Sequence, residues 1–131
     1  VLDNSVDQAL KSFEKAFELG ASNLNALALQ IRLLAERGRM QEARQRMERI
    51  PMVNWSAVLG TTAADVLNAV GEKDKAFVEA EKVAKGKPED PAIQTWFANI
   101  AFKAEKADAA EAAMKKAIEI LQDKVKAAGA Q

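Results

Sequence analysis

The sequence has 131 residues, which suits one compact domain or a few units of a larger repeat array. Hydrophobic residues make up 49% and charged residues 29%, a balance typical of folded rather than disordered chains. Nineteen Lys and Arg offset nineteen Asp and Glu, so the basic surplus of a nucleic-acid-binding protein is absent. There is no Cys, His or Tyr, which excludes disulfides, Cys- or His-based zinc sites and imidazole catalysis within these residues.

The sequence contains no recognisable targeting signal and no membrane-spanning segment. No apolar run approaches the roughly 20 residues of a membrane span, so we expect no membrane insertion. The N-terminus, from Val1 to Ser5, lacks an initiator Met and the basic and apolar regions of a signal peptide. We therefore expect a piece of a longer protein, whose compartment stays open.

Apolar residues recur at spacings of three and four throughout, as in Leu27, Ile31 and Leu34, and no stretch alternates like a strand. The predicted class is all-α. In chain order, the pattern and its breaks predict about seven helices, at residues 5–19, 23–37, 40–50, 55–70, 73–85, 91–104 and 107–127. Linkers of two to five residues predict that neighbouring helices are antiparallel.

Helix-ending and helix-starting residues support these boundaries. Glycine readily takes the left-handed conformation that ends a helix, and a glycine follows four of the periodic segments: Gly20, Gly38, Gly71 and Gly86. Polar residues suited to capping precede four segments: Ser5, Asn23, Asn54 and Asp90. Pro91, directly after Asp90, has its φ preset for a first helical turn.

A repeat is visible in the second helix of each predicted pair. Its marker is an alanine with a second apolar residue four positions later, and the leading alanines are Ala9, Ala43, Ala76 and Ala110. They are 34, 33 and 34 residues apart. Small residues let two helix backbones approach closely, and a fixed period of this size is typical of helical-repeat proteins.

These residues resemble the tetratricopeptide repeat (TPR) family. Gly38-Arg-Met-Gln-Glu-Ala43 and Gly71-Glu-Lys-Asp-Lys-Ala76 match its turn motif, in which Ala follows Gly by five residues. Glu105-Lys-Ala-Asp-Ala-Ala110 matches with the glycine replaced, and Gly86-Lys-Pro-Glu-Asp-Pro91 resembles the junction between units. The family's aromatic near the start of the first helix is absent at Leu27 and Gly60, so related helical-hairpin repeats remain an alternative.

The resemblance implies a right-handed α-solenoid forming a single domain over residues 1–131. Its units would be residues 23–54, 55–90 and 91–131, the last with an extended helix. Residues 1–22 would be the second helix of an incomplete unit. Because a repeat buries its apolar face only against neighbours, we expect further repeats upstream.

The sequence offers little for catalysis. Asp65 and Asp74 lie among small or charged residues and read as solvated rather than paired for acid–base work. Gly60-Thr61-Thr62 lacks the Lys of a phosphate-binding loop, and no EF-hand appears. A basic cluster is interleaved with Glu36, Glu42 and Glu48 and reads as a solvated helix face; its arginines are Arg37, Arg39, Arg44, Arg46 and Arg49. We expect no enzyme, cofactor, metal or nucleic-acid partner.

Binding is the function that the resemblance implies. In the TPR family, first helices of successive units line a concave groove that receives a protein or peptide segment. By register, this groove would present Asn25, Ala28, Arg32, Glu36, Val58, Thr61, Asp65, Asn68, Thr95, Asn99, Phe102 and Lys103. Asparagine and charged side chains can hydrogen-bond the extended backbone of a bound segment, and Ala and Phe leave apolar pockets for its side chains. The alternative interpretation is that these residues simply face solvent.

The aromatic residues divide between packing and contact. Trp55 and Trp96 favour packing between helices over contact with a partner. Trp96, Phe97 and Phe102 cannot all face one core, so at least one is expected to be partly exposed. The sequence thus predicts a protein–protein interaction scaffold. The alternative is an assembly module that pairs copies through its end faces, which would include Phe13, Phe17 and the stripe from Ile118 to Val125.

Overall fold

The computed structural model describes residues 7–12, 15 and 24–129, and this part of the chain is all helical, as predicted. Residues 7–12 are helical and precede seven further α-helices, so the described part contains eight. A short 3₁₀ helix, η1, also occurs. The bounds are α2 Leu24–Glu36, α3 Met40–Met47, η1 Met52–Asn54, α4 Trp55–Leu59, α5 Thr61–Ala69, α6 Lys73–Gly86, α7 Pro91–Lys103 and α8 Ala107–Gly129.

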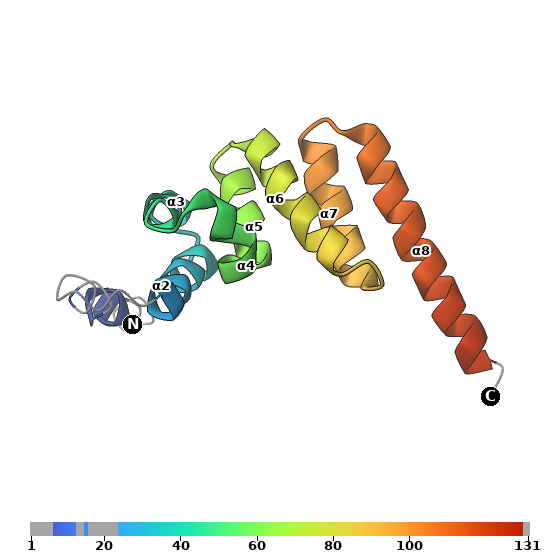
Figure 1. Cartoon of the computed structure of the whole chain (residues 1–131), viewed down its shortest axis with the longest axis horizontal. Coiled ribbons are helices and arrows are strands. Elements are labelled where there is room, and N and C mark those ends of the chain that lie inside the picture. The colour runs from blue at the N-terminus through green and yellow to red at the C-terminus, as the bar shows by residue number, and fades with distance from the viewer. Residues whose placement is uncertain (1–6, 13–14, 16–23, 130–131) are drawn as a thin grey trace.

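The helices pack largely in chain order. α2 contacts α3, α3 contacts α5, α5 contacts α6, α6 contacts α7 and α7 contacts α8. They follow one another along the long axis of the molecule, with α2 towards one end and α8 at the other (Figure 1). α8 has 23 residues and α7 has 13, so the last turns of α8 project beyond α7.

The single helix predicted over residues 55–70 is wrong. The helix is interrupted at Gly60, which lies between α4 and α5 and has φ 59° and ψ −131°. Glycine adopts this backbone conformation without the steric penalty that a Cβ brings. The apolar spacing continues through the break, so periodicity alone does not reveal it.

Three turns between helices share one backbone conformation. Gly38, Gly71 and Glu105 have φ of 75°, 90° and 62°. In each turn the next residue donates a backbone hydrogen bond five residues back, with N···O distances of 2.8–2.9 Å: Arg39 to Leu34, Glu72 to Leu67 and Lys106 to Ala101. This is the bonding of a Schellman motif, and it recurs at the period of the alanines.

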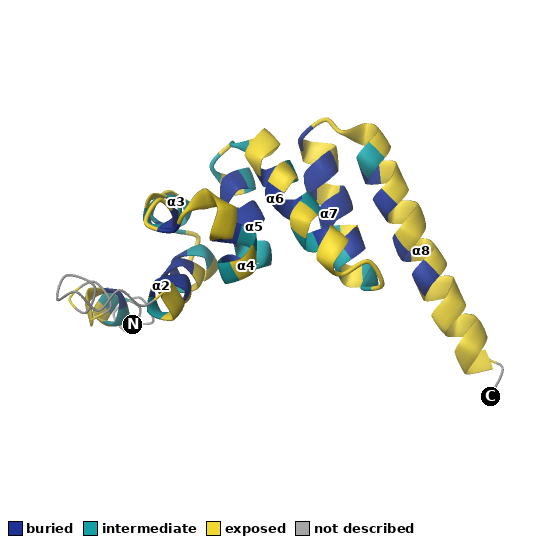
Figure 2. Ribbon diagram, in the orientation of Figure 1, coloured by how far each residue is buried: buried dark blue, intermediate teal, exposed yellow. Residues whose placement is uncertain are grey.

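Three of the four alanines that mark the period are buried. Ala43 and Ala76 are fully buried and Ala110 is 8% exposed, whereas Ala9 is half-buried. Many other core residues are also alanines, so helix backbones approach closely. The buried residues form an inner band along the row of helices (Figure 2).

Of the other residues predicted to start or end a helix, some do so as expected and others do not. Asp90 caps α7 as expected, because its side chain accepts from the backbone N–H groups of Ala92 and Ile93. Asn54 precedes α4 but makes no capping hydrogen bond with its side chain. Gly86 is the last residue of α6 and does not take the left-handed conformation. Several predictions fall outside the described residues: Ser5, Phe13, Phe17, Gly20, Asn23 and most of the helix at 5–19.

Glu105 is the one described non-glycine residue with positive φ, and we expect a Glu105→Gly variant to be more stable than wild type. The left-handed conformation costs a non-glycine residue about 1–2 kcal/mol, and the greater freedom of an unfolded glycine offsets part of the gain. A net gain of about 0.5–1 kcal/mol should appear in urea unfolding followed by circular dichroism.

The matched control is Gly71→Ala, for which we expect a loss of similar size. A Cβ at Gly71 meets no atom within 4 Å, so backbone strain alone sets its effect. A Glu105→Gly variant no more stable than wild type would contradict the left-handed turn.

Candidate binding surface

Arg32, Val58 and Thr61, three of the predicted groove residues, come together at the break between α4 and α5. The Arg32 guanidinium donates a hydrogen bond of 2.9 Å to the backbone oxygen of Val58. Arg32 and Thr61 line an open cavity of about 590 Å³ together with Lys82 and Lys87. The two lysines were not predicted, because Lys82 on α6 and Lys87 directly after α6 belong to no motif that relates them to α5.

Asp65 on α5 joins Trp96 on α7. The indole N–H of Trp96 donates to a carboxylate oxygen of Asp65 at 2.8 Å. Desolvation raises the pKa of Asp65, while the Trp96 hydrogen bond and the charge of Lys103 oppose this. The residue as a whole is still exposed, and water screens its charge, so the raised pKa has little effect on stability. Trp96 is half-buried: it packs against the core and also lines the surface of the domain.

Thr95, Asn99 and Phe102, three more of the predicted groove residues, line one open side of α7. Phe102 is 70% exposed, and the Thr95 hydroxyl donates to the backbone oxygen of Pro91 at 2.9 Å. Opposite them stands α8, whose Met114 closes a cavity of about 470 Å³ with all three residues. The expected exposed aromatic is thus chiefly Phe102, because Phe97 is buried and stacks near Phe77 at 5.6 Å between ring centroids.

A second cavity, of about 800 Å³, adjoins the first. Thr95 and Asn99 line both, and Leu121 of α8 lines the second. We call this continuous surface the α7–α8 groove, defined by Thr95, Asn99, Phe102, Met114 and Leu121. Towards the end of α8, Leu121 adjoins the exposed side chains of Ile118 and Val125 on the same helix. The groove therefore extends along α8 from Met114 to Leu121 and is mainly apolar.

The predicted α2 residues do not form such a surface. Ala28 is 3% exposed and belongs to the core, so its prediction as a groove residue is wrong. The register predicts which residues share one side of α2, but it does not predict which part of that side stays exposed. α4 and α5 pack against α2 and cover part of it. Asn25 and Glu36 are exposed, but eleven residues of helix place them about 16 Å apart.

Asn68 also departs from its predicted role. It is half-buried on α5, and its side-chain oxygen is buried without a hydrogen-bond partner among the described residues. Because this oxygen is buried, Asn68 cannot use it to accept a hydrogen bond from a bound polypeptide. Lys103, by contrast, is exposed at the end of α7 near Asp65.

Arg44 does not lie on a solvated face as predicted. Its side chain is 14% exposed and forms a two-pronged hydrogen bond with the carboxylate of Glu72, at 2.5 and 3.2 Å. This bond raises the pKa of Arg44 and lowers that of Glu72. The guanidinium also stacks on Trp55, 5.1 Å from the ring centroid. Arg44 thus ties α3 to the turn before α6.

Trp55 is a packing residue, as predicted. It is 3% exposed, and its indole N–H lies 3.0 and 2.9 Å from the backbone oxygens of Met47 and Ile50. These bonds fix the start of α4 against the end of α3. Trp55 therefore takes no direct part in the exposed surface.

Within the described residues, no three acidic side chains gather as a metal site would require. No helix there is both long and apolar enough to cross a bilayer. No protein-family model matches the chain, and no curated protein matches it at a significant level. What the structure establishes is an all-helical domain of about eight helices with sequential packing and an open apolar groove between α7 and α8.

Proposed function

We propose that this chain is part of a TPR-like α-solenoid and is a non-catalytic protein–protein interaction module. Its function would be equilibrium binding of another polypeptide, with no bond chemistry. The solenoid part of the proposal rests on the recurring turns at Gly38, Gly71 and Glu105 and on the buried alanines that follow each by five residues. A repeated turn followed by a close helix contact is typical of helical-repeat arrays.

The observation that carries the binding role is the α7–α8 groove. Phe102 is 70% exposed, and Met114 and Leu121 are 41% and 49% exposed. An exposed, contiguous apolar surface flanked by polar groups is typical of interaction sites. Asn99 and Thr95 add hydrogen-bonding groups along the same surface, and aromatic side chains such as Phe102 supply much of the binding energy at interfaces.

A photo-crosslinking experiment tests this function. Phe102 is replaced by benzoylphenylalanine, and the chain is irradiated once as a pure protein and once in a lysate of its source cells. We expect a specific crosslink to a polypeptide in at least one of the two settings, because the groove holds a partner against position 102.

The matched control carries the same group at Val53, which is 76% exposed on η1 and away from the groove. Absence of any crosslink at position 102, or equal crosslinking at both positions, would refute the groove as a binding site. The binding surface would then have to be sought elsewhere, for example at the Arg32 cavity.

A further inference from the structure

α8 carries an apolar stripe that its own chain leaves uncovered. The stripe consists of Met114, Ile118, Leu121 and Val125, which are 41%, 48%, 49% and 70% exposed. At 100° per residue these four side chains fall within a sector of about 60°. The face buried against α7 consists of Ala110, Ala113, Ala117 and Ile120 and is centred about 90° away. The stripe therefore borders the α7–α8 groove and faces away from the core.

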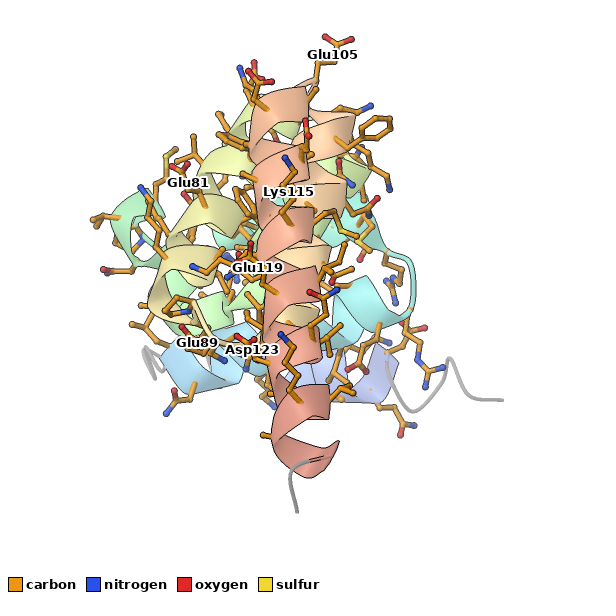
Figure 3. The ribbon with its side chains drawn as sticks, turned by 90° about the vertical axis from the view of Figure 1, so that its right-hand side faces the viewer. Glu81, Glu89, Glu105, Lys115, Glu119 and Asp123 are labelled. Atoms are coloured by element: carbon orange, nitrogen blue, oxygen red, sulfur yellow. The ribbon has the colours of Figure 1, made fainter. Side chains whose placement is uncertain are left out.

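A different face of α8 is polar. Lys115, Glu119 and Asp123 project outward along the helix, turned towards the viewer in Figure 3. Residues 121–129 are exposed all round, and the end of α8 projects past α7 (Figure 2). The most exposed member of the stripe, Val125, lies on this projecting end.

We propose, on the basis of the interaction function above, that the polypeptide bound in the α7–α8 groove is α8 of a second copy of this chain, paired antiparallel about a two-fold axis. The spacing of the stripe is four, three and four residues, the spacing of apolar positions in helices that pair side by side. It reads the same in both directions. A two-fold axis between Ile118 and Leu121 thus places Ile118 against Leu121 of the second copy, and Met114 against its Val125.

Charges beside the stripe fit the same register. The row on the side of the stripe away from α7 contains Asp108, Glu111, Lys115, Gln122 and Lys126. In the antiparallel pair, Glu111 faces Lys126 of the second copy and Lys115 faces its uncharged Gln122. Glu111 already bonds Lys115 of its own helix at 3.2 Å, so one carboxylate would join two lysines. This row opposes no like charges, and the pairing is electrostatically self-complementary.

The projecting end of α8 gives the third argument for a second copy. In this register, the end of each α8 reaches the cavity that Met114 and Phe102 line on the other chain. Val125 of each chain would then bury part of the apolar surface around Phe102 of the other chain; both side chains are 70% exposed in the single chain. A self-paired surface of this kind is isologous, the usual form of a dimer interface. Because the stripe offers only four apolar side chains from each chain, we expect a dissociation constant on the order of micromolar.

Sedimentation equilibrium of the purified chain, from about 1 µM to about 1 mM, tests the dimer. We expect the mass to rise from the monomer value of 14.2 kDa towards twice that value. Ile118→Glu should weaken the association at least tenfold. Val78→Glu is the matched control, because Val78 on α6 is also 48% exposed but lies outside the stripe, and it should leave the dimer unchanged.

A charge exchange tests the register. Glu111→Lys and Lys126→Glu should each weaken the dimer several-fold, and the double variant should restore it. Helical circular dichroism of each variant confirms that it is folded. A monomer at all concentrations, equal effects of Ile118→Glu and Val78→Glu, or a double variant no better than the singles would each overturn the proposed pairing.

These outcomes are separable from failure of the interaction function. A chain that is monomeric but crosslinks through position 102 to another protein retains the groove as a binding site and loses only the second copy as its occupant. A chain that is monomeric and gives no crosslink at position 102 loses both.

Discussion

A Trp55→Phe variant is expected to lose about 2–3 kcal/mol of unfolding free energy. Phenylalanine keeps an aromatic ring beneath Arg44 but removes the indole N–H, which donates to the backbone oxygens of Met47 and Ile50. An unsatisfied buried acceptor costs about 1–3 kcal/mol, and the lost ring volume leaves a gap in the core. Urea unfolding followed by far-ultraviolet circular dichroism measures the loss without relying on tryptophan fluorescence.

The other tryptophan is the matched control. Trp96→Phe removes one hydrogen bond to Asp65, whose exposed carboxylate takes water in its place, so we expect a loss below about 1 kcal/mol. Equal losses for the two variants would show that the buried indole bonds of Trp55 do not hold α4 against α3. Because Trp55 lies away from the α7–α8 groove, its substitution should leave crosslinking through position 102 unchanged.

A Gly60→Ala variant is expected to lose about 1–2 kcal/mol. The backbone at Gly60 has φ 59° and ψ −131°, a conformation that costs a residue with a Cβ about 1–3 kcal/mol, less a small gain from stiffening the unfolded chain. A Cβ there meets no atom within 4 Å, so the loss comes from the backbone alone. Chemical denaturation gives the free energy, and circular dichroism gives the helix content.

Gly86→Ala is the control, since Gly86 ends α6 without a positive φ and also has open space around its Cα. We expect it to be neutral or to gain up to about 1 kcal/mol. A more stable Gly60→Ala variant with greater helix content would mean that residues 55–70 form one continuous helix. The break, and the cavity beside Arg32, would then be absent.

The candidate site was only partly predictable from sequence. Register placed Thr95, Asn99 and Phe102 on one open side of α7, because residues three or four apart share a helix face. The same rule was wrong for Ala28, since which side of α2 is open depends on where α4 and α5 pack. The contact between Trp96 and Asp65 spans 31 residues, and no local pattern relates the two positions.

Local physical chemistry is what the sequence determined by itself. Apolar spacing defined the helices, Asp90 and Pro91 started α7, and the residues at Gly38, Gly71 and Glu105 marked turns at a fixed period. These features depend on a few neighbouring residues, whose preferences are legible along the chain. Tertiary structure alone decided that Arg44 is tied to Glu72 and that the stripe on α8 stays uncovered. Each of these depends on which surfaces meet in space, and contact between distant segments leaves no periodic signal in the sequence.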